Sequence, residues 1–214
     1  MKMKLMTAFA GAAIALTSCQ KDVMKNLSPG ESRIYITNSD STVDFNQFKT
    51  YSIADSVGVI EDNQILGKDV SAFDLAVIDA VKSAMQSRGY QLVDRSASPD
   101  LGITVSRIYS NSTGLISYPG YWDSYSSYYD PYYWGYGGYD YYDPSYYGPN
   151  YYATYSITQG ALSVDMLDLK GASNNTIKPV WSGLARGTGV FASSAAEGEV
   201  NAFFEQSPYL GTNQ

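Results

Sequence analysis

Residues 71–109 read SAFDLAVIDAVKSAMQSRGYQLVDRSASPDLGITVSRIY, a helical pattern followed by two strand patterns. In the first half, apolar residues recur every three or four positions, which predicts an amphipathic helix beginning at Ser71. Ser71 and Asp74 have the spacing of a capping box, with Asp in place of the usual Glu or Gln. Tyr90–Val93 and Asp100–Tyr109 have strand character, and the second alternates polar and apolar side chains. The stretch therefore predicts a helix followed by two strands.

Two further strands precede this helix. Arg33–Thr37 alternates, and Thr50–Ala54 has strand character. The residues between the second strand and the helix include Gly58 and Gly67 and are expected to form a loop.

A hairpin and a second helix are predicted near the C-terminus. A strand starting at about Tyr155 places Leu162, Val164 and Met166 on one face, and a turn over residues 171–175 leads to a strand at Pro179–Arg186. Trp181 in that strand is interpreted as a core residue rather than a ligand platform. A helix is expected over Ser194–Gln206. Together these elements predict a two-layer α+β sandwich. Its mostly antiparallel sheet of about six strands carries two helices on one face, and the other face is expected to be wetter.

Residues 110–155 interrupt this pattern as a long Tyr- and Gly-rich insert. They contain 16 of the 21 tyrosines and no Lys, Arg or His. Two approximate copies start with Tyr-Tyr-Asp-Pro and end on a glycine, which predicts a series of tight bends. Tyrosine provides stiff contact area with a hydroxyl at its tip, as in recognition loops. The expected interaction surface consists of Tyr128, Tyr129, Tyr132, Tyr133, Trp134, Tyr141, Tyr142, Tyr146 and Tyr147.

Two other interpretations of the insert stay open. It is either a flexible low-complexity loop or a loop that folds back to shield its own sheet. In all three cases we expect the domain to fold without it, because the strand and helix pattern is coherent on both sides.

Charge and residue usage exclude several classes of function. The formal charge is −7, which opposes binding to nucleic acid or anionic lipid head groups. There is no histidine and one cysteine, Cys19. Ser-His-Asp and Cys-His catalysis and an internal disulfide are therefore excluded, and a zinc site would lack its usual ligands. We expect no metal site and no cofactor.

The first 18 residues have the layout of a secretory signal peptide. Lys2 and Lys4 precede an uncharged apolar run that is too short to span a bilayer as a permanent helix. The following Leu16-Thr17-Ser18-Cys19 resembles the lipobox of bacterial lipoproteins. This resemblance implies cleavage between Ser18 and Cys19, acylation of Cys19, and anchoring to an envelope membrane, most simply the outer membrane.

Residues 19–32 are expected to form the lipidated cysteine and a tether, residues 33–206 a single domain, and residues 207–214 a C-terminal tail. Gln20-Lys21-Asp22 resembles the short export signal of some Bacteroidota surface lipoproteins, with a plain solvated tether as the alternative. The face of the membrane stays undecided.

Carboxylates are the remaining candidates for chemistry. Asp123, Asp130, Asp140 and Asp143 carry oxygen ligands that suit calcium, but their spacing matches no EF-hand or nonapeptide repeat. Asp165 and Asp168 are three positions apart, which puts them on opposite faces of a strand, and solvated or strand-end aspartates are expected. Gly183–Gly189 has glycines like those of a phosphate loop but is interpreted as a strand end.

The ordered motifs of the chain resemble the lipoprotein family called domain of unknown function 4136. The resemblance covers about Tyr35–Phe204. Its motifs are Asp44-Phe45, Phe48-Lys49-Thr50-Tyr51, Arg88-Gly89-Tyr90, Pro99-Asp100-Leu101, Gly160-Ala161-Leu162 with Asp165 and Leu167, and Val180-Trp181-Ser182-Gly183. It implies a bacterial envelope lipoprotein without a known activity and carries over no catalytic residue.

We therefore expect a non-enzymatic envelope module that binds or scaffolds through its Tyr-rich loop. Its partners would be the membrane, through the acyl chains on Cys19, and a glycan, peptidoglycan or another envelope protein. The alternative is a hydrolase that uses carboxylates alone.

Overall fold

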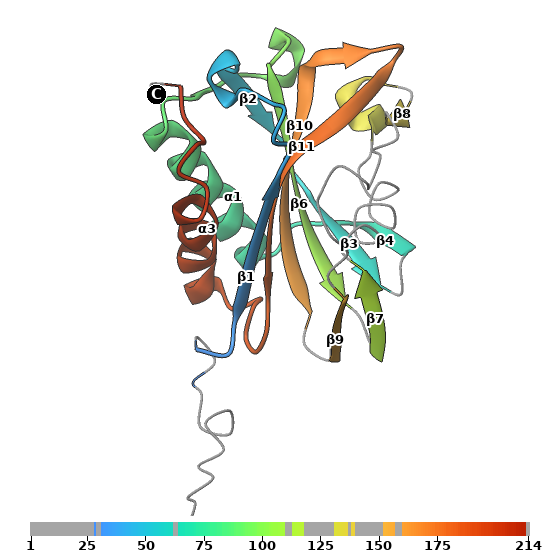
Figure 1. The fold of residues 1–214 in the computed structure, drawn as a ribbon, viewed down its shortest axis with the longest axis vertical. Helices are drawn as coiled ribbons and strands as arrows, with labels where there is room; N and C mark the ends of the chain where they lie inside the picture. The colour runs from blue at the N-terminus through green and yellow to red at the C-terminus, as the bar shows by residue number, and fades with distance from the viewer. Residues whose placement is uncertain are drawn as a thin grey trace, which may run out of the picture.

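A computed structural model describes residues 28, 31–61, 64–109, 113–117, 131–136, 138–139, 152–156 and 160–212. Two helices, α1 (Ala72–Ser87) and α3 (Ala196–Glu205), pack together on one side of a curved sheet (Figure 1). The predicted α+β sandwich is confirmed.

The main sheet has nine strands within the described residues, more than the six expected, and its central order is β1-β11-β10-β6-β2-β5. The pairings along β1, β11, β10 and β6 are antiparallel, whereas β2 runs parallel to β6 and to β5. Their bounds are β1 Ile34–Ser39, β2 Thr50–Ile53, β5 Gln91–Leu92, β6 Leu101–Tyr109, β10 Ala161–Ser173 and β11 Thr176–Arg186.

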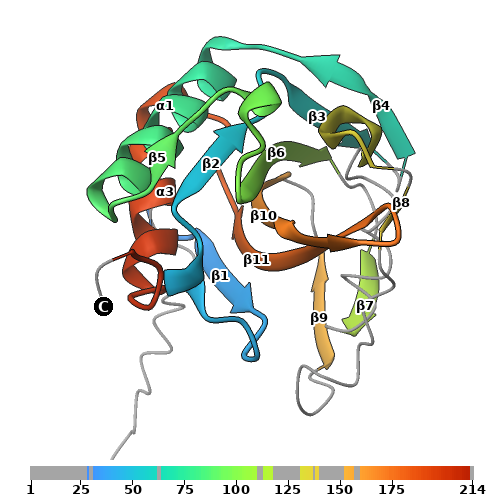
Figure 2. The same ribbon diagram turned by 90° about the horizontal axis from the view of Figure 1, so that it is seen from above.

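The expected loop between β2 and α1 contains a hairpin instead. Strands β3 (Val57–Glu61) and β4 (Gln64–Asp69) pair antiparallel, and β3 continues along the same edge of β6 that β2 occupies. Figure 2 shows the sheet curling at β3 and β4. The glycines that indicated a loop lie within these strands, Gly67 at a φ of 154° where the register shifts.

The helix side of the sheet carries the large core. Ser71 and Asp74 make the capping box that the sequence predicted, with both reciprocal hydrogen bonds present. Buried residues of α1 and α3 pack on alternate residues of the central strands. They are Phe73, Val77, Ile78, Val81, Met85, Val200, Phe203 and Phe204, against Leu101, Ile103, Val105, Leu162, Val164, Met166 and Trp181.

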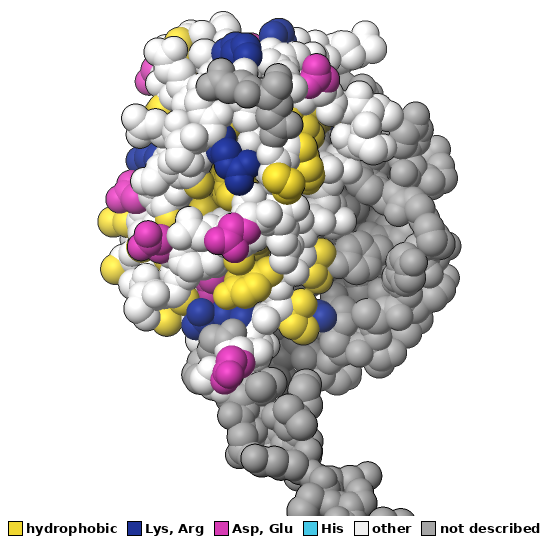
Figure 3. All heavy atoms as spheres, turned by 60° about the vertical axis from the view of Figure 1, so that its left-hand side comes forward, with side chains coloured by type: hydrophobic (Ala, Val, Ile, Leu, Met, Phe, Trp, Pro, Cys, Tyr) yellow, Lys and Arg dark blue, Asp and Glu magenta, His cyan; other side chains and the backbone are white. Residues whose placement is uncertain are grey.

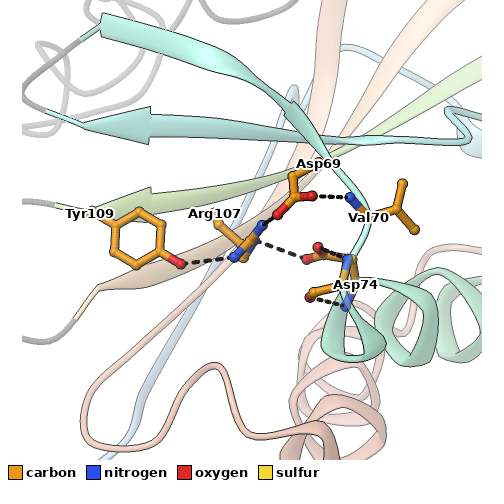
Figure 4. A network of polar contacts seen from close by, with 6 residues as sticks. Asp69, Val70, Asp74, Arg107 and Tyr109 are labelled. Atoms are coloured by element: carbon orange, nitrogen blue, oxygen red, sulfur yellow. Dashed lines mark hydrogen bonds and ion pairs between the residues drawn. The ribbon is translucent and has the colours of Figure 1, made fainter.

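A polar network fastens the start of α1 to this side of the sheet (Figure 4). Arg107 on β6 lies 3.1 Å from the buried Asp74 and 2.8 Å from Asp69 at the end of β4, and it donates to Tyr109 Oη at 2.9 Å. Burial lowers the pKa of Arg107, but these partners outweigh it and the pKa is raised overall. The guanidinium thus links β4, α1 and β6.

The hairpin of β10 and β11 turns at Asn174 and Asn175, which both have positive φ, 51° and 63°. Two such residues suit a two-residue turn whose twist matches that of the strands. The strands consequently extend further than the five-residue turn predicted.

Residues 207–212, expected as a tail, pack onto the domain. Ser207 and Leu210 are fully buried, and Arg88 donates to the carbonyl oxygens of Phe204, Ser207, Pro208 and Leu210. The Trp181 indole donates to Ser207 Oγ at 2.9 Å. This segment therefore closes the core beside α3.

The sheet face away from the helices is buried too, so the expectation of a wetter face is wrong for the central strands. In β10, the residues from Ala161 to Leu167 are all buried, whichever side they face. The polar residues of this face include Ser52, Ser106, Ser163, Asp165 and Ser182, each at most 6% exposed. Alternation of polar and apolar residues therefore did not distinguish a wet face from a covered polar face.

Parts of the insert are described as well. Strands β7 (Thr113–Ser117) and β9 (Tyr152–Ser156) pair antiparallel, and β8 (Gly138–Tyr139) pairs with β11. A short 3₁₀ helix, η4 (Pro131–Trp134), lies beside β8 on the side of the sheet away from the helices (Figure 1).

The outer face over the helices exposes hydrophobic side chains between acidic and basic ones (Figure 3). Large exposed hydrophobic residues include Leu75 and Leu92, at 52% and 47%. Among the described residues, neither helix has the length and apolar character needed to cross a bilayer.

Candidate functional site

Residues 131–136, here called the docked segment, attach the insert to the sheet. The Trp134 side chain is 6% exposed and belongs to a buried cluster with Ala54, Leu167, Leu169 and Ile177. Gly102 on β6 makes this contact close, since a Cβ there would lie 3.0 Å from two Trp134 ring carbons. The indole therefore rests on the strand itself.

Tyr136 and Tyr133 hold the docked segment on both sides of Trp134. Tyr136 donates from its hydroxyl to the Leu169 carbonyl at 3.1 Å. Arg95 donates to the Tyr133 carbonyl at 2.6 Å and its guanidinium lies 4.5 Å from the centre of the Tyr133 ring, while Lys68 Nζ lies 4.8 Å from the same ring. Two cations thus contact Tyr133, an arrangement that the negative face of an aromatic ring favours.

A groove of about 590 Å³ opens beside Tyr133. It forms where β5 ends. Strand β5 pairs only with Thr50 and Tyr51 at the start of β2, so the rest of β2 has no strand beside it on the β5 edge. Its walls combine apolar and polar groups of mixed charge: Ser52, Ile53, Ala54, Asp55, Ile78, Lys82, Leu92, Val93, Asp94, Arg95, Ser96 and Tyr133. This volume lies within the range of small-ligand pockets.

A second hollow of about 240 Å³ lies on the other side of Arg95. Its lining includes Trp134, Tyr136, Leu169, Lys170 and Asp100. Arg95 lines both spaces, so the groove and the hollow meet at this side chain. The docked segment forms one wall of each.

The acidic residues around the two spaces serve mainly structural roles. Burial raises the pKa of Asp100, but the backbone amides of Lys49 and Thr50, which donate to Oδ2 at 2.7 and 3.1 Å, outweigh it and the pKa is lowered overall. The Ser96 hydroxyl and amide hold the pKa of Asp94 below its ordinary value. Both carboxylates are therefore charged near neutral pH and bonded within the fold.

The structure describes only part of the predicted interaction surface. Tyr133 is half-buried at the groove, whereas Trp134 is buried against the sheet, so Trp134 is not an exposed contact residue. For the docked segment, the alternative that the insert shields its own sheet is the correct one. Outside the described residues lie Ser18, Cys19, Tyr128, Tyr129, Tyr141, Tyr142, Tyr146 and Tyr147, together with the Tyr132 side chain.

The candidate carboxylates do not form a catalytic pair among the described residues. Asp165 is 2% exposed and accepts a hydrogen bond from Ser163 Oγ at 2.7 Å, so the expectation that it is solvated is wrong. Asp168 lies further along β10, bonded to the Gly171 amide, and burial raises its pKa. Among the described residues no group of three or more His, Cys, Asp or Glu gathers as a metal site requires, and Asp123, Asp130, Asp140 and Asp143 lie outside them.

Two other interpretations concern β11. Trp181 is fully buried between the strands and α3, as expected of a core residue. Gly183 lies near the end of β11, which stops at Arg186, and Gly187 and Gly189 follow that end, as the strand-end interpretation predicted.

The residues that shape the groove were not anticipated. They include Leu92 of β5, Arg95 and Ser96 of the short 3₁₀ helix Arg95–Ala97, and Lys82 of α1, and the sequence patterns of these segments show no sign of a site. An Asp-Arg-Ser sequence after a short strand indicates only a turn. Their proximity to Tyr133 depends on tertiary contacts between segments almost forty positions apart.

Comparisons with known proteins support the resemblance. The family model described as Domain of unknown function (DUF4136) matches residues 36–209. A crystal structure of a DUF4136 family protein from Bacteroides thetaiotaomicron is similar at 29% identity and a TM-score of 0.66, over 85% of this chain and 99% of that chain. A PDZ domain protein from Parabacteroides distasonis is similar at 12% identity and a TM-score of 0.44, over 83% of this chain and 36% of that one. No curated protein matches.

The family model covers most of the chain, from within β1 to beyond the end of α3. The chain belongs to the DUF4136 family, whose function is unknown.

Proposed function

We propose that this protein is a lipid-anchored, non-enzymatic binding module of a bacterial cell envelope. The observation that carries the proposal is the groove of about 590 Å³ beside Tyr133, built jointly by the domain and by the docked segment of the insert. Pockets of this size with a few polar groups on a partly apolar wall are the usual form of small-ligand sites.

The position of the groove suits an anchored protein. The described chain enters the domain at β1, whose start pairs with Arg186 at one end of the sheet, whereas the docked segment and η4 lie toward the other end (Figure 1). From Cys19 to Arg33 the chain reaches at most about 50 Å when fully extended. Acyl chains on Cys19 would therefore place the membrane beyond the end of the sheet that lies opposite the groove.

The groove lining favours a short segment of a polar polymer. Leu92 and Ile78 offer apolar contact, while Ser96, Lys82 and Asp55 provide donors and acceptors. A saccharide or peptidoglycan fragment combines apolar C–H faces with many hydrogen-bonding groups, which matches this mixture. Tyr133 acts here as a wall held by two cations rather than as a free stacking surface.

Binding can be tested by filling the groove. Ser96→Trp puts a large side chain at an exposed position on its wall, and Ser87→Trp does the same at an exposed position outside all described hollows. Each serine hydroxyl makes one local hydrogen bond, to Asp94 and to Ala84 respectively. We expect calorimetric titration with muropeptides and chitin oligomers to show binding by the wild type and Ser87→Trp, and at least tenfold weaker binding by Ser96→Trp.

Equal affinity in the two variants would exclude the groove as the binding site. The anchor is tested separately by cell fractionation. Cys19→Ala should release the protein from membranes, and continued membrane retention would contradict lipidation at Cys19.

A further inference from the structure

We infer that Arg95 and the Trp134 indole N–H form a carboxylate-binding subsite between the groove and the smaller hollow. This inference rests on the proposed binding function and names the chemistry that the ligand must carry. It concerns the short 3₁₀ helix Arg95–Ala97 after β5 and the docked segment, which meet only in the folded protein.

Arg95 is held in place while most of its donors stay available. One guanidinium nitrogen donates to the Tyr133 carbonyl, and the guanidinium lies 4.5 Å from the Tyr133 ring centre. Asp94 attracts it electrostatically, but in the described part of the chain no carboxylate lies within ion-pair distance of it, and the side chain is exposed. A guanidinium fixed by a ring and a carbonyl presents its remaining N–H groups in a planar fork that matches a carboxylate.

The indole N–H of Trp134 is the second donor of the proposed subsite. Its Nε1 is buried and has no hydrogen-bond partner among the described residues, although the side chain lines the 240 Å³ hollow. Buried N–H donors are nearly always paired, because an unpaired donor loses its bond to water without replacement. By contrast, the Trp181 indole is paired with Ser207. Because Nε1 is itself enclosed, a ligand oxygen entering from the hollow would pair with this donor after a small shift of the docked segment.

The local charge favours a monoanion. Lys170 Nζ lies 3.8 Å from Asp100 and donates to the Gln47 carbonyl, and Asp100 is already bonded to two backbone amides. The charges of Lys170 and Asp100 thus offset each other. Arg95 interacts electrostatically with Asp94, whose Oδ1 accepts hydrogen bonds from the Ser96 amide and hydroxyl. The guanidinium fork suits the geometry of carboxylate and phosphate alike, but one cation balances the single charge of a carboxylate and leaves the second charge of a phosphate monoester without a partner.

The test compares ligands that differ only in charge. The full-length chain, purified in detergent, is titrated with an N-acetylmuramyl peptide in its free carboxylate form and in its carboxamide form. A uronate trisaccharide, triacetylchitotriose and methyl phosphate complete the set. Calorimetry gives the affinities, and the indole signals of the three tryptophans report contact with Trp134.

We expect the carboxylate forms to bind at least tenfold more tightly than the carboxamide and to shift the Trp134 indole signal. Arg95→Gln should abolish this preference, so that the carboxylate and carboxamide forms bind this variant with equal affinity. Lys49→Gln, which removes a cation that lines neither hollow and donates to the Thr212 carbonyl, should leave the preference intact. Comparison of the muramyl peptide with the uronate identifies a peptide or a sugar as the source of the carboxylate.

Equal binding of the carboxylate and carboxamide would overturn the subsite while leaving the groove as a binding site. Tighter binding of methyl phosphate, or failure of every carboxylate to bind, would also overturn it. In the last case, triacetylchitotriose and the Ser96→Trp variant still decide the proposed function. A preference that survives Arg95→Gln would assign the carboxylate to other residues.

Discussion

The two faces of the sheet are sealed in different ways. On the helix side, α1 and α3 supply regularly spaced apolar side chains, and Trp181 is fully buried with its indole bonded to Ser207. On the other side, the docked segment lays Trp134 on Gly102, its indole N–H lacks a partner in the described structure, and the smaller hollow opens beside it. The groove opens at the sheet edge between Tyr133 of this segment and α1. The first arrangement maximises stability, whereas the second leaves donors and space for a ligand.

The largest expected contrast between the faces comes from removing each tryptophan. Trp181→Ala leaves a cavity between Phe203, Phe204 and the strands and should lower the free energy of unfolding by about 3–5 kcal/mol. Trp134→Ala should lower it by only about 1–2 kcal/mol, because the docked segment can move to relieve the cavity. Chemical denaturation measures both. Equal losses would show that the docked segment belongs to the core.

A matched pair of glycines tests the same contrast with a single methyl group. A Cβ at Gly183 would lie 2.7 Å from the Phe203 ring and one at Gly102 3.0 Å from the Trp134 ring. Gly183→Ala should destabilise the protein by about 2 kcal/mol because a packed helix cannot retreat, and Gly102→Ala by less than about 1 kcal/mol. A larger effect at Gly102 on thermal unfolding would contradict the movable segment.

The helix side also contains one unfavourable charge, and removing it should stabilise the protein at alkaline pH. Glu199 on α3 is fully buried, neither of its oxygens has a hydrogen-bond partner in the described residues, and Arg33 lies 3.6 Å away. Burial raises the pKa of Glu199 to about 7, although Arg33 lowers it in part. The folded state then holds this proton more tightly than the unfolded chain, so stability falls as pH rises from about 4.5 to 7.

Glu199→Gln should therefore raise the free energy of unfolding at pH 8 by about 1–2 kcal/mol and have little effect at pH 5. No histidine titrates in this window. Asp168, whose pKa burial also raises, would add a change in the same direction in both proteins. Denaturation of the two proteins at pH 5 and pH 8 measures the difference. Destabilisation of the variant at pH 8 would mean that the Arg33 ion pair outweighs the burial of the charge.

The sequence predicted the features that depend on residues close together in the chain. The capping box of Ser71 and Asp74, the alternation in β6 and the helix near the C-terminus are local patterns, and the structure contains each of them. Local patterns failed where a distant segment decides the outcome. Strands β3 and β4 read as a loop because of their glycines, yet β3 is held by pairing with β6.

The candidate site was predictable only in part. The density of tyrosines drew attention to the insert, and one of the tyrosines named, Tyr133, lines the groove. Composition could not show that Trp134 is buried or that Asp165 is covered on a polar sheet face, since both depend on what packs above them. Arg95 carried no signal, because its role depends on contact with a ring 38 residues further along the chain. The insert is consequently not a simple addition to a finished domain, as removing it would uncover Leu167 and Ile177.

We expect the docked segment to be a separable wall of the groove, attached to the sheet but not part of its core. Hydrogen exchange of the tryptophan indole N–H groups under native conditions tests it directly. The Trp181 signal should exchange only with the free energy of global unfolding, whereas the Trp134 signal should be protected but exchange with a smaller free energy through local undocking. Exchange of Trp134 at the rate of a free indole would show that the segment is not docked. Exchange of both signals with the global free energy would show that it is part of the core.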